Sequence, residues 1–177
     1  MHLTKIFFII TSLLVLSACN LDIPEPTTSV FATANEITLS RIIDGDTFEM
    51  SNGDTVRVLG IDYPDISNNR IDKWTNLGLS EERIRFCYKE GIAMLNQKYK
   101  GKTVELTPDF NEVEKDRYGR LLLYVYVDGV DIGNELINNG YAVTYDPTES
   151  KLCSRCMIYL NDEIIVKMAK EGCLWEK

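Results

Sequence analysis

The stretch EITLSRIIDGDTFEMSNGDTVRVLGI, residues 36–61, largely determines the fold of this chain. It holds three β-rich segments separated by two turn signals, Asp44-Gly45-Asp46 and Ser51-Asn52-Gly53. Asn-Gly between two extended segments is one of the strongest short-range signals for a β-hairpin. In the last segment Val56 and Val58 alternate with Arg57, so Arg57 is expected on the face opposite to the valines. The stretch therefore predicts three antiparallel strands.

The chain after this stretch contains both helical and extended patterns. Residues from Pro64 to Leu79 are mostly polar and predict a long loop. Ser80 can cap a helix that runs to Gly101 with apolar residues every three or four positions, although Gly91 inside it favours a break. Further strands are expected at 102–107 and 121–127, a short helix at 134–139 and a last helix at 152–170. This order predicts an α+β fold whose strands curl into a small barrel.

The amino-terminal segment has the pattern of a bacterial export signal. Lys5 precedes an apolar run from Ile6 to Leu16 that is too short to cross a bilayer. The run ends in Leu16-Ser17-Ala18-Cys19, which resembles the lipobox of bacterial lipoproteins. The resemblance implies a signal peptide over 1–18, lipidation of Cys19, a flexible tether over 19–35 and a folded domain over 36–177. The protein is then expected to be extracytoplasmic and lipid-anchored to a membrane of the cell envelope. An ordinary signal peptide with an incidental cysteine is the alternative.

The composition excludes several kinds of catalytic site. The chain has 177 residues, 19 Lys and Arg, 27 Asp and Glu, a formal net charge of −8 and one histidine, His2, in the leader. A domain without histidine cannot contain a Ser-His-Asp triad, a Cys-His pair or an HExxH zinc site. The acidic charge also argues against tight, sequence-independent binding of nucleic acid. Catalysis therefore has to depend on carboxylates, arginines, tyrosines, cysteines or a metal with oxygen ligands.

Three short polar segments next to strand ends carry the chemistry. They are Ile43-Asp44-Gly45-Asp46-Thr47, the stretch from Val56 to Asp65, and Asp116-Arg117-Tyr118-Gly119-Arg120. Clustered Asp side chains and backbone carbonyls are hard oxygen ligands, which favour Ca²⁺ or Mg²⁺. Arginines on neighbouring strands can donate two hydrogen bonds to a phosphate, and a further carboxylate can orient a water. The alternative for each segment taken alone is a turn whose arginines form surface salt bridges.

In this order and spacing, the three segments resemble the staphylococcal nuclease family. The matching residues are IDGDT at 43–47, R-x-x-x-x-D-x-P from Arg57 to Pro64 and DRYGR at 116–120, and YVDG at 126–129 and NELINNGYA at 134–142 extend the match. The resemblance implies a five-stranded OB-fold-type β-barrel with three helices. It also implies Ca²⁺-dependent hydrolysis of DNA and RNA by attack of a water on phosphorus, leaving 3′-phosphate products.

The resemblance further implies roles for the residues that match the family's motifs: ligands of Ca²⁺, groups that bind the phosphate during catalysis, and contacts to a substrate phosphate. These are, respectively, Asp46, Asp62 and the backbone carbonyl of Tyr63; Arg57 and Arg120; and Arg117 and Tyr118. Tyr63 replaces the family's usual threonine, which a backbone ligand tolerates. We expect a monomer that takes DNA, RNA or both as substrate.

One position departs from the family's pattern. The family's water-orienting residue is a glutamate directly after D-x-P, where this chain has Asp65. Aspartate is one methylene shorter, which removes about 1.3–1.5 Å of reach, and a misplacement of about 1 Å can lower a rate about 100-fold. Asp65 is therefore expected to be the catalytic carboxylate, either as a weaker base or with a compensating shift of its loop. The alternative is a catalytically weak or inactive OB-fold module that binds nucleic acid or a surface polymer.

The four cysteines besides Cys19 are expected to form disulfides in an exported protein. If 154–170 is helical, Cys156 and Cys173 lie up to about 25 Å apart along the helix axis, beyond disulfide reach. Cys173 is then expected to pair with Cys87, which leaves Cys153 with Cys156. A zinc site of four cysteines, a redox-active C-x-x-C and free thiols are the alternatives.

Overall fold

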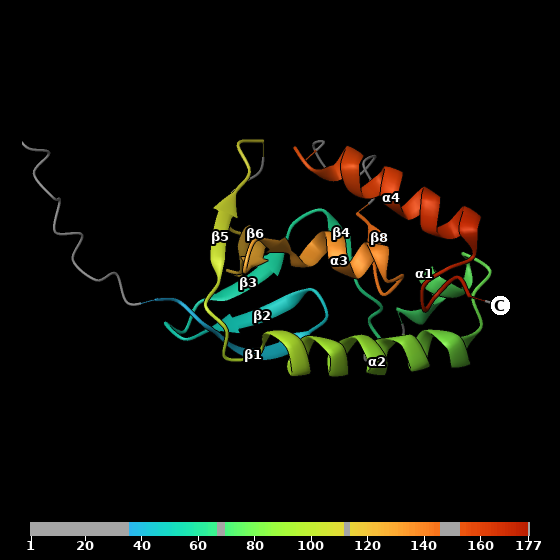
Figure 1. Ribbon diagram of the computed structural model, residues 1–177, viewed down its shortest axis with the longest axis horizontal. Coiled ribbons are helices and arrows are strands. Elements are labelled where there is room, and N and C mark those ends of the chain that lie inside the picture. Colours follow the sequence, from blue (N-terminus) through green and yellow to red (C-terminus); the bar gives the residue numbers. More distant parts are fainter. Residues whose placement is uncertain (1–35, 67–69, 112–113, 146–152, 177) are drawn as a thin grey trace, which may run out of the picture. The chain divides into compact units, whose positions relative to one another are not determined.

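The first three strands form the antiparallel meander that residues 36–61 predict. The computed structural model describes residues 36–66, 70–111, 114–145 and 153–176 (Figure 1). The strands are β1 (Leu39–Asp44), β2 (Thr47–Met50) and β3 (Thr55–Val58), each antiparallel to the next. Val56 and Val58 are buried whereas Arg57 is partly exposed, which agrees with the predicted alternation.

The sheet is mixed because β3 also pairs in parallel with a strand from the second half of the chain. Its order is β1-β2-β3-β6-β5, with β6 at Leu121–Val127 and β5 at Glu105–Pro108. Three shorter strands complete the ladders: β7 (Val130–Asp131) pairs with β6, and β4 (Ile61–Asp62) pairs with β8 (Val143–Thr144). The parallel pairing brings the segment that opens β6 next to β3, and with it two of the predicted motifs.

The predicted five-stranded barrel is not confirmed, because the sheet is not closed. Within the described residues, the only bridge between the chain next to β1 and the chain next to β5 is Thr38–Thr103. Backbone hydrogen bonds around it join Leu39 to Gly101 and Lys102. Gly101, with φ +80°, turns the chain directly out of the preceding helix, so few residues lie beside β1 before β5 pairs with β6.

The described residues contain four helices rather than the three expected. They are α1 (Ile71–Thr75), α2 (Glu81–Tyr99), α3 (Ile132–Asn138) and α4 (Cys156–Ala169). Helix α1 lies in the stretch predicted as a loop. No side chain caps its amino terminus, but Trp74 is buried against Ile84 of α2 and Leu174 of the carboxyl-terminal segment. Tertiary burial of one aromatic side chain therefore stabilises a helix that local sequence does not predict.

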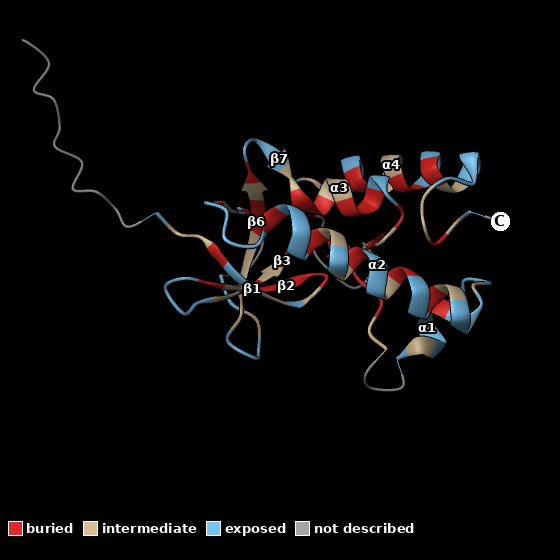
Figure 2. Cartoon of the chain, turned by 60° about the horizontal axis from the view of Figure 1, so that its bottom comes forward, coloured by how far each residue is buried: buried red, intermediate tan, exposed pale blue. Residues whose placement is uncertain are grey.

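Helix α2 is continuous through Gly91, where a break was expected. Ser80 caps it, with Oγ accepting the backbone N–H of Arg83 at 3.2 Å. In Figure 1 one end of α2 adjoins β1 and the helix runs from there along the bottom toward α1, whereas α4 lies at the top and packs against α3. Buried and exposed residues alternate along both helices, as in amphipathic helices that cover one face (Figure 2). Among the described residues, no helix is long and apolar enough to span a bilayer.

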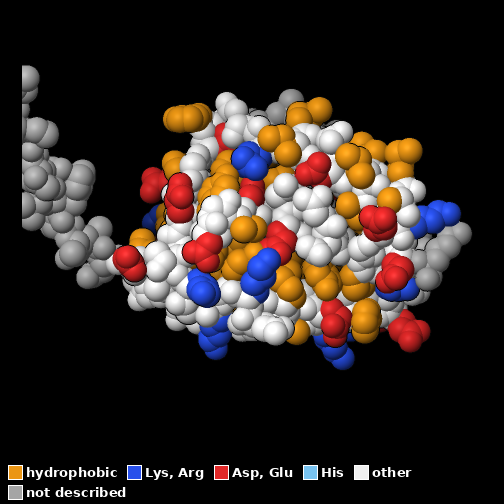
Figure 3. Space-filling view, in the orientation of Figure 1, with side chains coloured by type: hydrophobic (Ala, Val, Ile, Leu, Met, Phe, Trp, Pro, Cys, Tyr) orange, Lys and Arg blue, Asp and Glu red, His pale blue; other side chains and the backbone are white. Residues whose placement is uncertain are grey.

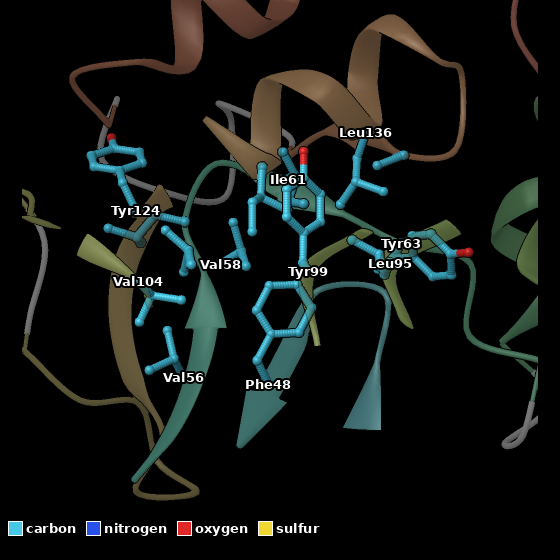
Figure 4. Packing of buried hydrophobic residues seen from close by; sticks show 14 of the residues in the cluster. Phe48, Val56, Val58, Ile61, Tyr63, Leu95, Tyr99, Val104, Tyr124 and Leu136 are labelled. Atoms are coloured by element: carbon cyan, nitrogen blue, oxygen red, sulfur yellow. The ribbon is translucent and has the colours of Figure 1, made fainter. Parts of the chain in front are cut away.

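The main core fills the space between the sheet and α2 and α3. Figure 4 shows Phe48, Val56 and Val58 of the sheet directed toward Tyr99 of α2 and Leu136 of α3. A smaller cluster around Trp74 packs α1 against α2 and the carboxyl-terminal segment. The predicted strand pattern therefore leads to a core on one face of the meander.

Two disulfides join the cysteines in the pairing expected from the helix length. Cys87 of α2 is bonded to Cys173, and Cys153 to Cys156 at the start of α4. The first bond holds the carboxyl-terminal segment against α2. The predicted signal peptide, Cys19 and the tether at 19–35 lie outside the described residues.

Candidate active site

The residues predicted to bind metal, phosphate or water line one cleft of about 550 Å³. They come from the turn between β1 and β2, from β3, from β4 and the residues after it, and from the turn that precedes β6. These residues are Asp46, Arg57, Asp62, Tyr63, Asp65, Arg117, Tyr118 and Arg120. The cleft is also lined by residues to which the sequence assigned no role: Asp44, Thr47, Arg70, Asp116 and Tyr145.

We call the part of the cleft formed by Asp44, Asp46, Arg57 and Asp62 its floor. There, Arg57 links the two predicted carboxylate ligands. Its Nη1 lies 2.9 Å from Asp46 Oδ2, and its Nη2 lies 3.2 Å from Asp62 Oδ1. Nη1 also donates to the carbonyl of Val58 at 3.2 Å. The side chains of Arg57 and Asp46 are only 12% and 8% exposed. A guanidinium bound in this way is held in position before any substrate arrives.

Arg120 reaches the same floor from the opposite wall. Its Nε and Nη2 each lie 2.8 Å from Asp116 Oδ2, while Asp116 Oδ1 accepts the backbone N–H groups of Tyr118 and Arg120. Arg120 Nη1 donates to Thr47 Oγ1 at 3.1 Å, and that hydroxyl donates to Asp46 Oδ1 at 3.0 Å. Hydrogen bonds thus connect the two predicted catalytic arginines through Thr47 and Asp46.

Hydrogen bonds lower the pKa of Asp116, so it stays ionised beside Arg120. Partial burial raises the pKa of Asp116, but the hydrogen bonds from Arg120 and from the turn's backbone lower it below its ordinary value. Asp116 therefore acts as the fixed anionic partner that orients Arg120 toward the floor. The DRYGR motif contains this residue, so the motif itself is the signal that finds it.

The exposed edge of this wall is cationic and aromatic. Tyr118 is 65% exposed, and the guanidinium carbons of Arg117 and Arg120 lie 4.9 and 5.6 Å from the centre of its ring. Such stacking keeps two positive groups at the mouth of the cleft. The arrangement suits an anionic ligand that enters over this edge.

Tyr63 fastens the segment after β4 to helix α2. Its backbone N–H donates to Asp46 Oδ2 at 2.9 Å, and its hydroxyl donates to the carbonyl of Tyr88 at 2.7 Å. The ring passes between two glycines: a Cβ at Gly45 would lie 2.2 Å from its Cγ, and one at Gly91 would lie 2.2 Å from its Oη. Burial, followed by the charge of Asp44, raises the pKa of Tyr63, so the hydroxyl stays protonated. The side chain that replaces threonine is thus buried and structural.

The floor carries more negative than positive charge. Burial, together with the charge of Asp46, raises the pKa of Asp44 to about 7. Burial also raises the pKa of Asp46, although Arg57 and the amide of Tyr63 oppose that rise. Asp44 belongs to the IDGDT motif, so the clustered aspartates were a signal for it. The cleft is therefore suited to a further cation.

Asp65 and Arg70 line the cleft, and Lys73 contacts Asp62 of its lining. The sequence indicated neither cation. Arg70 Nη1 lies 4.0 Å from Asp65 Oδ2, and Lys73 Nζ lies 2.8 Å from Asp62 Oδ2. Both cations belong to α1 or its amino-terminal cap. The stretch was expected to be a loop, so no pattern pointed to them; Trp74 between polar residues was the available signal of a buried helix.

The oxygen donors of the floor are of the kind that Ca²⁺ binds, but they are engaged with other partners. Among residues 36–66, 70–111, 114–145 and 153–176, no three His, Cys, Asp or Glu side chains are arranged as a metal site. The oxygens of Asp46 and Asp62 accept hydrogen bonds from Arg57, Thr47, Tyr63 and Lys73. The floor has more carboxylates than cations, and a backbone carbonyl lies beside them. These groups fit a hard divalent ion that would displace some of the hydrogen-bond donors from the carboxylates.

A smaller pocket of about 180 Å³ adjoins the cleft. It shares Arg57, Asp116, Arg120 and Tyr145 with the cleft. Apolar residues such as Ile61 and Leu122 form much of its wall. The Cys153–Cys156 disulfide closes one side of it. An apolar cavity next to two arginines suits a flat, uncharged group attached to a phosphate.

Comparison with known proteins agrees with this geometry. A family described as staphylococcal nuclease homologues matches residues 55–177, a range that includes Arg57, Asp62 and Arg120 but begins after Asp46. Endonuclease YncB of Bacillus subtilis is 35% identical over 118 residues, which cover 63% of this chain and 50% of that protein. The SPbeta prophage-derived endonuclease YokF of the same organism is 34% identical over 119 residues, which cover 63% of this chain and 36% of YokF.

An uncharacterized protein of Methanocaldococcus jannaschii is 29% identical over 117 residues, or 59% of this chain and 56% of the relative. The chain thus spans about half or less of the length of most curated relatives described here. The family match covers residues 55–177, which is most of the folded part. On that match, the chain belongs to the staphylococcal nuclease homologues.

Proposed function

We propose that this protein is a nuclease that hydrolyses phosphodiester bonds of DNA and RNA with Ca²⁺ as its cofactor. One observation carries the proposal: Arg57 lies between Asp46 and Asp62 on the floor of a cleft that Arg120 enters from the opposite wall. Membership of the family and the two relatives named as endonucleases support it. Because no histidine lies in the described residues, the chemistry rests on carboxylates and guanidinium groups.

The two arginines are placed to bind a phosphate during the reaction. Each can donate to a non-bridging oxygen, and each is oriented by its own carboxylate partner rather than by the substrate. As a water attacks, negative charge grows on the phosphate oxygens, and fixed donors stabilise that charge without reorganisation. Asp46, Asp62 and the carbonyl of Tyr63 would hold Ca²⁺, which supplies positive charge next to the phosphate and the attacking water.

Asp65 is the carboxylate assigned to the attacking water. It lines the cleft beside the floor, and its side chain is only 24% exposed. It would orient the water and accept its proton as the oxygen–phosphorus bond forms. The bond from phosphorus to the 5′ oxygen breaks, that oxygen takes up a proton from solvent, and the product keeps a 3′-phosphate. The small apolar pocket beside Arg57 and Arg120 would accept a nucleobase next to the bound phosphate.

A degradation assay tests the proposal. Residues 20–177 are incubated with plasmid DNA and with RNA, in Ca²⁺ and in a chelator, and the product ends are identified by their sensitivity to a 3′-phosphatase. Cleavage that requires Ca²⁺ and leaves 3′-phosphates is expected. Cleavage independent of Ca²⁺, or no cleavage in any condition, contradicts the proposal. Retained binding without cleavage would instead favour the inactive binding module.

We also propose that the protein is extracytoplasmic and anchored by lipid at Cys19, as the Leu16-Ser17-Ala18-Cys19 segment implies. Cells expressing the full chain are labelled with radioactive palmitate. The wild-type chain should carry the label and sediment with membranes, and Cys19→Ser should do neither. Labelling of both chains would contradict the anchor.

A further inference from the structure

Helix α1 and its cap carry two cations that the proposed chemistry does not use: Arg70, which lines the cleft, and Lys73, which contacts Asp62 of its lining. Arg70 forms the amino-terminal cap of α1, and Lys73 lies three residues later, so both project from one side of this short helix. Trp74 anchors another side in the core at 1% exposure. Figure 3, which shows one face of the molecule, has acidic and basic side chains interspersed without a basic stripe. Two neighbouring cations beside the cleft therefore stand out against the acidic charge of the whole protein.

We propose that Lys73 and Arg70 form a second phosphate-binding site, which takes the phosphate next to the one that is cleaved. This proposal rests on the proposed function, which identifies the phosphate that is cleaved. Its substrate class is a nucleic acid strand with at least two successive phosphates. Helix α1 would thereby favour cleavage of polymers over cleavage of esters that contain a single phosphate.

The spacing of the cations supports this site. Lys73 Nζ and Arg57 Nη2 contact the two oxygens of the same Asp62 carboxylate, at 2.8 and 3.2 Å. The two positive groups therefore lie within about 8 Å of each other on standard bond lengths. Successive phosphates of a single strand are spaced on the same scale. A strand with one phosphate at Arg57 thus presents its neighbour to Lys73.

The difference in exposure explains why Lys73 can exchange partners more easily than Arg57. Arg57 is 12% exposed and bound to two carboxylates and a carbonyl, whereas the side chain of Lys73 is 54% exposed and its ammonium contacts Asp62. An exposed lysine moves its ammonium group at little cost, since a surface ion pair contributes about 1 kcal/mol or less. A cation bound at Asp62 would repel the ammonium group toward the strand.

Arg70 extends the site away from the floor. Its side chain is 66% exposed, lines the same cleft, and lies at 4.0 Å from Asp65 Oδ2. Arg117 and Tyr118 form the opposite edge of the mouth. The strand is then bound on both sides of the cleft, by α1 on one side and by the 116–120 turn on the other. This arrangement concentrates positive charge where the net charge of −8 would otherwise repel a polyanion.

Two substrates separate this site from the catalytic floor. Thymidine 5′-(4-nitrophenyl phosphate) contains one phosphate, whereas an oligothymidylate of eight nucleotides contains neighbours on both sides. For Lys73→Gln, the ratio of kcat/KM on the oligonucleotide to kcat/KM on the single-phosphate ester should fall about three- to tenfold. The dependence of log kcat/KM on log salt should become shallower by about 0.7 for each phosphate that the variant no longer binds. Adding Arg70→Gln should enlarge both effects.

The control that matches Lys73→Gln with Arg70→Gln removes the same charge elsewhere. Lys100→Gln with Lys102→Gln deletes two exposed cations next to the start of β1, whereas the cleft lies at its end. This double variant should leave the ratio within about twofold. An equal fall in the control would show that only net charge matters. An equal loss on both substrates in Lys73→Gln would show that Lys73 acts through Asp62. Either outcome overturns the site, as does an unchanged ratio.

A binding measurement keeps the site testable if the proposed function fails. Fluorescence anisotropy of labelled oligothymidylate in a chelator reports binding without cleavage. If the wild-type protein cleaves neither substrate, the nuclease proposal fails, but Lys73→Gln with Arg70→Gln should still weaken binding about three- to tenfold relative to the control pair. Equal binding by both pairs would overturn the phosphate site.

Discussion

The floor and the rim of the cleft differ in how firmly their charged groups are held. On the floor, Arg57 and Asp46 are 12% and 8% exposed and make several hydrogen bonds each. On the rim, Lys73, Arg70 and Tyr118 are more than half exposed. Electrostatic interactions are strong where water is excluded and weak where it is not. With the proposed function, this comparison predicts that the floor binds the reacting phosphate and the rim binds the rest of the strand.

The largest expected effect comes from breaking the floor while keeping its charge. Arg57→Lys should lower kcat/KM on an oligonucleotide about 10³-fold, because one ammonium group cannot hold both carboxylates and donate in parallel to a phosphate. On the rim, Arg117→Gln should lower it only about threefold at 0.1 M salt. Thermal unfolding of each variant checks that the fold survives. Similar losses in the two variants would remove the distinction between floor and rim.

The next effect concerns the shortened carboxylate at the edge of the floor. Asp65→Ala should lower kcat about 100-fold and leave Ca²⁺ affinity, measured by calorimetry, within about threefold. Asp65→Glu, which restores the family's glutamate, should match or exceed the wild-type kcat because it recovers the missing reach. Equal activity of the wild type and Asp65→Ala would eliminate Asp65 as the base.

A third change tests the contact between Tyr63, which follows Asp62 of the floor, and Gly91 of α2. Gly91→Ala places a Cβ 2.2 Å from Tyr63 Oη, which should lower the free energy of unfolding by about 2 kcal/mol. In the Tyr63→Phe background the closest atom is gone, so the same substitution should cost about 1 kcal/mol less. Urea denaturation of the four chains gives this coupling. Additive effects would mean that Tyr63 does not need the glycine.

The smallest effect concerns the excess negative charge of the floor. The pKa of Asp44 is about 7 in the folded protein and 3.8 in a free side chain, so the folded form binds the proton more tightly. Without metal, stability is therefore expected to fall as pH rises from about 4 to about 7. Asp44→Asn carries no charge and should be more stable than wild type by about 1–2 kcal/mol at pH 8 in a chelator. At pH 3.5 the two should unfold alike; a constant difference across this range would contradict the assignment to Asp44.

Much of the site could be predicted because its residues lie in short local motifs. The hairpin signal at Asn52-Gly53 and the alternation around Arg57 depend on neighbouring residues, and both agree with the structure. The length of the helix expected at 154–170 separates Cys156 from Cys173, so Cys173 was expected to pair with Cys87, as it does in the structure. These features follow from backbone periodicity, which a single sequence displays.

Other features depend on contacts between distant segments. Helix α1 exists because Trp74 is buried against Ile84 and Leu174, and no local pattern in a polar stretch encodes that burial. The predicted barrel failed for a similar reason, since closure requires long pairing between the chain around β1 and the chain before β5. The glycine at 91, which led us to expect a break in α2, instead makes room for the hydroxyl of Tyr63, a residue 28 positions away.

The amino-acid sequence alone established which chemical groups this protein can use: aspartates, arginines and tyrosines in short motifs, with His2 as the one histidine. Composition and motif spacing are properties of the sequence itself, so they could be established without the folded structure. The folded arrangement was needed to show that Arg57 joins Asp46 to Asp62, that Thr47 connects Arg120 to them, and that Lys73 stands beside the same carboxylate. Those contacts arise from parallel pairing of β3 with β6 and from the burial of Trp74, both of which join residues far apart in the chain.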